Sequence, residues 1–307
     1  MNEIKFGVEG RFRLDALRSD GSIRELAPWQ DNLVTNYGID SLCTSRSFIK
    51  YLQVGTGTTA EAYTDTNLAN RIAGVSTTDS TVWNTGANKV VTTLTASFGA
   101  GVTTGNITEL GLSPSVNGNV NTRALIRDSS GNPISVTVLS NEQLLVTYTI
   151  TITIPSETVV NVTEPNRGTN YTITIRPGQP YSSQITPSCL STHPSSLGNV
   201  VFASYPDAIY STGAQPAPWA SASLPSNFTN PLPTGVHTDG TMYHDTTLSV
   251  PVGKLYHSIS TVMIGDRDGA PQSYGGFCCP FTFGFSPAFT KTAIQSITFT
   301  VRCTWVR

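Results

Sequence analysis

The sequence predicts an all-β protein made of two β-sandwich-like domains, with one or two short helices in the N-terminal domain. Charged residues make up only 12% of its 307 residues, about half the usual share. The 12 Phe, 11 Tyr and 4 Trp supply enough aromatic side chains for a core. The high content of Thr and Ser, together with 26 Gly and 19 Pro, favours short strands joined by tight turns. The low content of Glu and Lys excludes a helical bundle.

Strands are expected in the N-terminal half wherever apolar and polar residues alternate. The clearest is 143–154, where Val146, Tyr148 and Ile150 point one way and threonines point the other. The segment 5–23 predicts one or two strands closed by a turn at Asp20-Gly21. Further strands are expected at 51–54, 89–98, 105–112, 123–127 and 134–138.

Two short helices are expected in the same half. The first covers about 37–47, with Asn36 as its N-cap and Asp40 in its first turn. The second covers 66–73, because Leu68 and Ile72 stand four residues apart.

The second half is richer in Pro and poorer in charge, which predicts a domain boundary near residue 164. We expect an N-terminal β-sandwich at 1–164 and a C-terminal β-rich domain with long Pro/Ser/Gly loops at 165–307. Strands of this second domain are expected at 171–175, 200–205, 247–250, 258–263, 276–285 and from 293 to the end of the sequence.

Charge and hydropathy exclude several classes of partner. The net charge is −2 and the pI is about 6.1, so the chain lacks the basic footprint of a nucleic-acid-binding protein. It has no apolar run of the length that spans a membrane, and its first residues lack a signal sequence, which predicts synthesis in a cytoplasm. A monomer with so few charged residues is poorly protected against association with other copies. The composition therefore favours a homo-oligomer.

Candidate chemistry is sparse in this sequence. His237, Asp239, His244 and Asp245 are ligand types found in metal sites, but their spacing is not that of a zinc protease, and a polar interface loop is the preferred interpretation. The vicinal pair Cys278-Cys279 is interpreted as two reduced thiols. Tyr210, Trp219 and Tyr243 are candidates for an interface or for ligand contact.

An enzyme is not predicted. The glycine-rich segment 54–59 has no following Gly-Lys-Ser/Thr, so it is not a phosphate-binding loop. A glycosidase needs two carboxylates, yet 165–307 contains no Glu. The sequence also lacks a Gly-x-Ser-x-Gly nucleophile elbow. We therefore predict no catalytic residue, no cofactor and no metal.

An ordered set of motifs in the first half resembles structural proteins of tailed bacteriophages, which are labelled tail, tail-fibre or collar proteins. The similarity covers about residues 30–155, and its motifs are Asn32-Leu-Val-Thr-Asn-Tyr-Gly-Ile39, Val54-Gly-Thr-Gly-Thr-Thr59, Asp65-Thr-Asn-Leu68, Ile107-Thr-Glu-Leu-Gly-Leu112, Arg123-Ala-Leu-Ile126 and Gln143-Leu-Leu-Val-Thr-Tyr-Thr149.

The resemblance implies a non-enzymatic component of a virion, in the tail, neck/collar or baseplate region. Such a protein would form a homo-oligomer of 3, 6 or 12 copies and dock to other virion tail or neck proteins. The alternative is a receptor-binding tail-fibre protein, or adhesin, whose C-terminal head binds a host surface glycan. We expect 1–164 to anchor the protein to the particle and to fold alone as a soluble domain, whereas 165–307 alone should aggregate or oligomerise.

Overall fold

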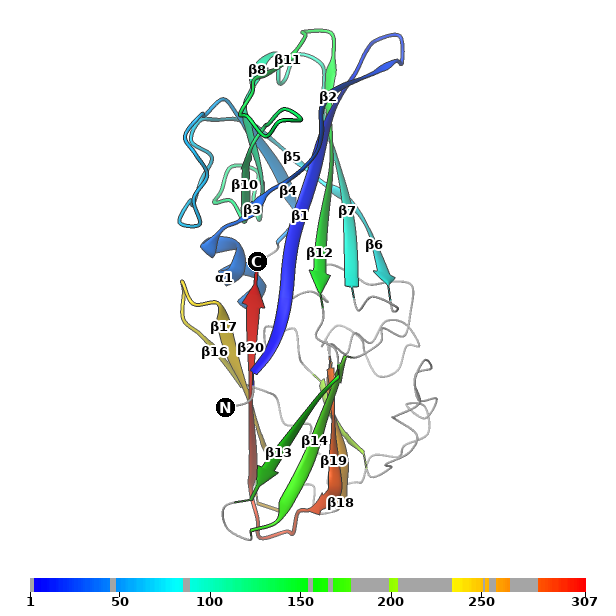
Figure 1. Ribbon diagram of the computed structural model, residues 1–307, viewed down its shortest axis with the longest axis vertical. Helices are drawn as coiled ribbons and strands as arrows, with labels where there is room; N and C mark the ends of the chain where they lie inside the picture. The colour runs from blue at the N-terminus through cyan, green and yellow to red at the C-terminus, as the bar shows by residue number, and fades with distance from the viewer. Residues whose placement is uncertain are drawn as a thin grey trace.

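The structure is a computed structural model that describes residues 3–44, 48–84, 89–153, 157–164, 168–177, 199–203, 234–250, 252–253, 258–265 and 281–307. These residues form several β-sheets and one helix, so the predicted all-β class with few helices is confirmed. The molecule is elongated, with one group of strands above another along its long axis (Figure 1). No helix in the described residues is long and apolar enough to cross a membrane.

The largest sheet has eight strands in the order β16-β17-β20-β1-β12-β7-β6, and β2 also pairs with β1. The long strand β1 pairs with β12 on one side, and with β20 and then β2 on the other. Its strands are β1 (Glu3–Leu17), β2 (Ile23–Asp31), β6 (Thr78–Asn84), β7 (Lys89–Phe98), β12 (Gln143–Thr153), β16 (Thr234–His237), β17 (Tyr243–Val250) and β20 (Ile297–Val306).

Residue alternation determines which face of this sheet is buried. In β12 each second residue from Leu144 to Ile152 is buried and the intervening residues are half-buried, as the sequence predicted. The paired strand β7 follows the same rule, with Leu94, Ala96 and Phe98 on the buried face. Each large side chain buried in this way contributes about 1.5–3 kcal/mol to stability.

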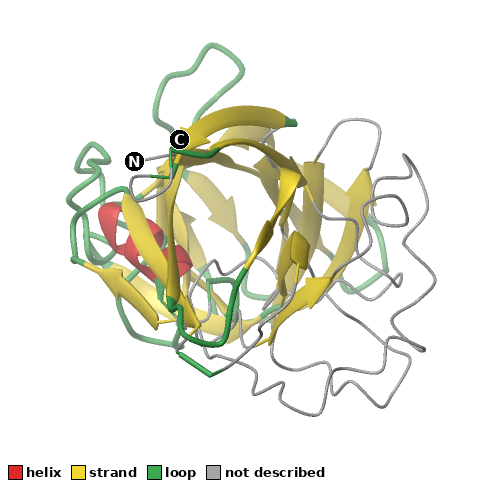
Figure 2. Cartoon of the chain, turned by 90° about the horizontal axis from the view of Figure 1, so that it is seen from below, coloured by secondary structure: helices red, strands yellow, loops and turns green. Residues whose placement is uncertain are grey.

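A second sheet, in the order β3-β10-β9-β4-β5, shares the core of the first. The hydroxyl of Tyr148 on β12 donates to Thr122 Oγ1 on β10 over 2.8 Å, and so connects the two sheets. Viewed along the long axis, the strands curve around a common interior with the helix at one side (Figure 2). The elements here are β3 (Leu33–Val34), α1 (Asn36–Cys43), β4 (Tyr51–Gly55), β5 (Arg71–Ser76), β9 (Glu109–Ser113) and β10 (Thr122–Leu125), beside a two-stranded sheet of β8 (Gly105–Ile107) and β11 (Val136–Val138).

A third sheet forms the lower part of the molecule in Figure 1, in the order β13-β14-β19-β18-β15. Its strands are β13 (Thr158–Thr163), β14 (Asn170–Pro177), β15 (Asn199–Ala203), β18 (Ser258–Gly265) and β19 (Phe281–Thr290). The sequence predicted a strand in or near four of these segments but none in the β13 segment, which lies just before the predicted domain boundary.

Three local predictions need correction. The N-cap of α1 is Thr35 and not Asn36, because the Thr35 hydroxyl accepts a hydrogen bond from the Gly38 amide. Asp40 consequently lies beyond the first turn, which contains no acidic residue. The predicted helix at 66–73 is wrong: the segment is a turn that leads into β5, where Val54 and Ala73 are strand partners. The predicted strand at 105–112 is two strands, β8 and β9, which belong to different sheets.

The sheets do not follow a division of the chain at residue 164. The range 1–164 contributes β13 to the third sheet, and 165–307 contributes β16, β17 and β20 to the largest one. The C-terminal strand runs parallel to the first strand, with Glu3 opposite Arg302 and Gly7 opposite Val306. Strand β20 also places the side chains of Cys303 and Trp305 in the same hydrophobic core as the strands of the N-terminal half.

The carboxylate of Glu142 joins the β1–β2 hairpin to the start of β12. Its oxygens accept hydrogen bonds from Arg24 Nη2 at 2.6 Å and from the Leu139 amide at 3.0 Å. The hydrogen bond from Arg24 is the main cause that lowers the pKa of Glu142 from 4.5 to about 2. A carboxylate with a depressed pKa in the folded state contributes stability above its unfolded pKa and loses that contribution as pH falls.

We therefore expect the free energy of unfolding to fall as pH is lowered from 4.5 towards 2, partly through Glu142. In Glu142→Gln this pH dependence should be shallower, as measured by urea unfolding at a series of pH values. Glu9→Gln, which removes a carboxylate of 63% exposure, is the matched control and should keep the wild-type slope. If the free energy of unfolding depends on pH equally in the wild type and in both variants, the role assigned to Glu142 is wrong.

Candidate functional site

Five of the seven residues singled out in the sequence lie on one hairpin. β16 and β17 carry His237, Tyr243, His244 and Asp245, and Asp239 lies in the turn between them. Gly240 in the same turn has a φ of 84°, a conformation that favours glycine. The other two candidates, Tyr210 and Trp219, lie outside the described residues, as do Cys278 and Cys279.

The structure does not bring His237, Asp239, His244 and Asp245 together as one set of ligands. Asp245 makes two hydrogen bonds of 2.7 Å with Arg302 on β20. The hydrogen bonds from Arg302 are the main cause that lowers the pKa of Asp245. His244 is fully buried, opposite Cys303 in the strand pairing. Neither residue belongs to the cluster that His237 and Asp239 form.

Tyr243 is also engaged within the protein. The Arg302 guanidinium lies over its ring, 3.7 Å from the ring centroid. A cation held over an aromatic face is stabilised by the ring electrons. The Arg302 side chain therefore links Tyr243 and Asp245 of β17 to β20, and this face of the ring is covered by the protein itself.

His237 meets a partner that the sequence did not indicate. Its Nε2 lies 2.8 Å from Asp40 Oδ1 on α1 and 4.0 Å from Asp239 Oδ1. The same Asp40 oxygen accepts a hydrogen bond of 2.9 Å from the Gly240 amide. His237 and Asp40 are 197 positions apart in the chain, so no local spacing pattern reveals this contact. The side chains of His237 and Asp40 are 4% and 10% exposed.

The helix holds Asp40 in place through its own buried contacts. The Thr35 hydroxyl caps the helix and donates to the Val120 carbonyl over 2.8 Å. Gly38 packs so closely that a Cβ there would clash with the Asn121 carbonyl oxygen. The first turn of α1 is therefore fixed against the loop before β10, and Asp40 faces the β16–β17 hairpin.

The protonation of His237 is constrained by its hydrogen bonds. Nδ1 lies 2.8 Å from the Tyr243 carbonyl oxygen, and because a carbonyl only accepts, Nδ1 carries a proton. In the neutral ring Nε2 then has a lone pair that points at the Asp40 carboxylate. The contact is favourable when a proton lies between Nε2 and the carboxylate oxygen, or when a metal ion takes the place of that proton. Asp40, His237 and Asp239 are the group of potential metal ligands that the described residues contain.

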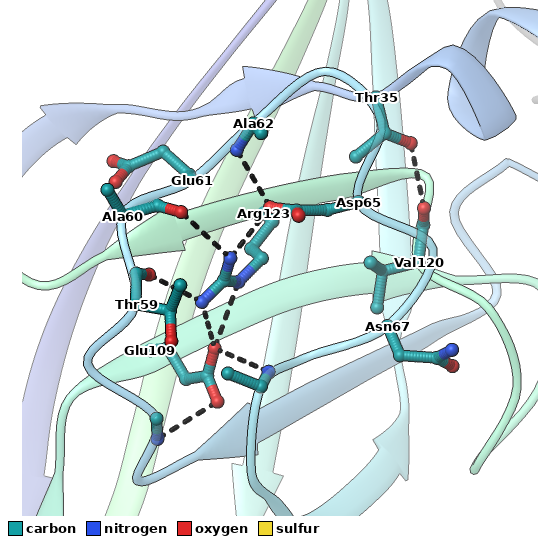
Figure 3. A network of polar contacts seen from close by, with 12 residues as sticks. Thr35, Thr59, Ala60, Glu61, Ala62, Asp65, Asn67, Glu109, Val120 and Arg123 are labelled. Atoms are coloured by element: carbon teal, nitrogen blue, oxygen red, sulfur yellow. Dashed lines mark hydrogen bonds and ion pairs between the residues drawn. The ribbon is translucent and has the colours of Figure 1, made fainter.

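A second buried polar cluster lies under the glycine-rich loop (Figure 3). Glu109 on β9 is fully buried and accepts from Arg123 Nε on β10 at 3.0 Å. Its two oxygens also accept from the amides of Gly57, Ala69 and Asn70, at 2.7–3.0 Å. The carboxylate thus binds both arms of the loop that runs from β4 to β5.

Arg123 completes this cluster from the other strand. Its Nη1 donates to Asp65 Oδ2 over 2.6 Å, and its Nη2 donates to the Thr59 carbonyl over 2.7 Å. Burial acts to lower the pKa of Arg123, but the hydrogen bonds that it donates to Asp65 and Glu109 outweigh burial and raise it. The guanidinium is therefore charged and joins the loop to the sheet.

Sequence reasoning used the motifs that contain Glu109 and Arg123 but did not identify the pair. A signal was present, because each is the one charged residue of a short strand whose other residues are uncharged, and charged residues are almost never fully buried unless paired. The close approach of backbones in this region also explains the glycines. A Cβ at Gly57 would clash with Glu109 Oε1, and one at Gly111 would clash with the Thr122 carbonyl oxygen.

Gly111→Ala is expected to destabilise the protein by about 1–3 kcal/mol, the usual cost of overpacking. The clash is with backbone rather than with a flexible side chain, so a strand must move to relieve it. Chemical denaturation measures the effect, and Gly99→Ala is the matched control, because a Cβ there meets its first atom at 3.9 Å. Equal stability of the two variants would contradict the packing argument.

No family model, curated protein or solved structure matches this chain.

Proposed function

We propose that this protein is a non-enzymatic structural component of a bacteriophage virion, in the tail, neck/collar or baseplate region, which acts by forming a homo-oligomer and docking to other virion proteins. The observation that carries the proposal is the position of the motif residues. Residues from several separate motifs, including Gly57, Asp65, Glu109 and Arg123, converge on one buried cluster. The resemblance therefore rests on residues that build a scaffold.

The surface of the protein supports association. Charged residues are few, and the alternate residues of β12, mostly threonines, form a half-buried face that tolerates either water or a neighbouring chain. An uncharged, exposed edge strand is a template for pairing with another chain. Among the described residues, strand β13 is the last strand of its sheet; its sequence is Thr-Val-Val-Asn-Val-Thr, and Val159 and Val162 are 55% and 37% exposed. We infer that β13 is one of the edges through which copies meet.

The first test is the composition of purified particles. The protein should be found in virions in a fixed ratio of 3, 6 or 12 copies, by quantitative mass spectrometry against a known capsid protein. Absence from purified particles would overturn the proposal. Binding of the purified protein to host cells or to a host glycan would instead favour the receptor-binding alternative.

The second test addresses association through β13. Size-exclusion chromatography with light scattering should give an oligomer for the wild type. The double variant Val159→Lys and Val162→Lys should shift it towards the monomer, because like charges at the edge oppose pairing. Ile23→Lys, at a residue of 64% exposure on β2, is the matched control and should keep the oligomer. An oligomer that survives both changes would exclude β13 as the interface.

A further inference from the structure

The β16–β17 turn and helix α1 bring together three potential metal ligands from distant parts of the chain. Asp40, His237 and Asp239 each offer one ligand atom, and these atoms all lie within 4.8 Å of one another. We propose that these three residues bind a divalent transition-metal ion of the Zn²⁺ type, which fastens the hairpin to the helix. The inference is independent of the proposed function.

The orientation of His237 is that of a metal-binding histidine. Its Nδ1 donates to the Tyr243 carbonyl, which fixes the ring and leaves the Nε2 lone pair directed at the two carboxylates. Metal-bound histidines usually donate their second ring nitrogen to a carbonyl or a carboxylate in this way. The buried ring, with 4% of its side chain exposed, therefore points an unprotonated nitrogen into the site when neutral.

The distances are close to those of a tetrahedral site. Ligands about 2.0–2.1 Å from a zinc ion lie roughly 3.3 Å from each other. The Asp40–His237 separation of 2.8 Å must lengthen slightly, and the Asp239–His237 separation of 4.0 Å must shorten. Asp239 lies in a turn with a 74% exposed side chain, so it is free to make this adjustment. Water supplies the fourth ligand, as in other sites with three protein ligands.

Charge and ligand type favour a transition metal. With a neutral His237 the site carries two negative charges, and no Lys or Arg of the described residues forms an ion pair with Asp40 or Asp239. A divalent ion neutralises both charges. Calcium and magnesium prefer oxygen ligands alone, whereas an imidazole nitrogen suits zinc, cobalt and nickel.

The neighbouring thiol does not belong to this group of ligands. Cys43 lies three residues after Asp40 on α1 and is buried. A metal ion held at this point connects the helix to a hairpin about 200 positions later in the chain and stabilises the folded state by mass action.

The test is cobalt and zinc binding to the full-length protein after treatment with EDTA. Isothermal titration should give one ion per chain, and added ZnCl₂ should raise the melting temperature. Asp239→Asn, at an exposed position that does not threaten folding, should weaken binding by at least about 10–100-fold, the range seen when a group that only orients a ligand is removed, and so should His237→Gln. Asp79→Asn, which removes another exposed carboxylate, is the matched control and should bind as the wild type does.

The absorption of the cobalt-loaded protein identifies the ligands. Nitrogen and oxygen ligation gives visible d–d bands without the near-ultraviolet charge-transfer band of a cobalt–thiolate bond. A thiolate band would assign the ion to cysteines instead and overturn the proposal. Equal binding by Asp239→Asn and the wild type would also overturn it. If the wild type binds neither ion, the proposal is wrong, and the contact between His237 and Asp40 is held by a proton instead of a metal.

Discussion

Arg123→Ala is expected to lower the free energy of unfolding by about 3–5 kcal/mol, the cost of removing one partner of a buried ion pair. The change leaves the carboxylate of Glu109, which is fully buried, without its counter-charge. It also removes the hydrogen bonds that the guanidinium donates to Asp65 and to the Thr59 carbonyl. Urea unfolding measures the loss. Hydrogen exchange should show faster opening of the loop between β4 and β5.

Arg127→Ala is the matched control for this variant. Arg127 pairs with Glu61 at 2.7 Å, but its side chain is 34% exposed. Water screens such a pair, so its removal should cost at most about 1 kcal/mol. Similar losses for the two arginines would mean that the Arg123 cluster is not the structural centre that its geometry indicates.

Removal of β20 is expected to have the second largest effect, because this strand joins the two ends of the chain. Truncation after residue 296 removes the parallel partner of β1 at Glu3–Gly7 and the side chains of Cys303 and Trp305 from the core. Trp305 packs on Phe6 with 5.3 Å between ring centroids. Light scattering should show aggregation of the truncated protein, because the Phe6 ring and the edge of β1 become exposed.

The same argument applies to the fragment 1–164, which also lacks β20. We expect this fragment to be less stable than the full chain, and the pairing of β20 with β1 argues against the earlier expectation of an autonomous soluble domain. A soluble, monomeric fragment with the unfolding midpoint of the full chain would contradict the role assigned to β20.

A point substitution tests β20 in the intact chain. Trp305→Ala should cost about 3–5 kcal/mol, the usual range for a buried tryptophan. Val306→Ala changes the adjacent residue of the same strand, whose side chain is 48% exposed, and should cost less than about 1 kcal/mol. Equal losses at the two positions would show that the core contact of Trp305 is not what holds the strand.

The sequence alone determined the secondary structure where the local pattern is strong. The alternation in β12 predicted both the strand and its buried face, from Leu144 to Ile152. The predicted bounds of β7 match the structure. The pattern failed at 66–73, where Leu68 and Ile72 suggested a helix but the second half of the segment pairs with β4. The pairing of β5 with β4 outweighed a helical pattern that rested on only two apolar residues.

The candidate site depended on contacts that only the tertiary structure decides. The sequence singled out His237 and Asp239, yet their third partner, Asp40, was assigned only to the first turn of a helix. Alternation reports which face of a strand is buried but not which strand lies beside it, because pairing depends on the path of the whole chain. For that reason the sequence by itself determined the all-β class and the faces of its clearest strands. Only the tertiary structure placed β20 beside β1, Arg123 beside Glu109, and His237 beside Asp40.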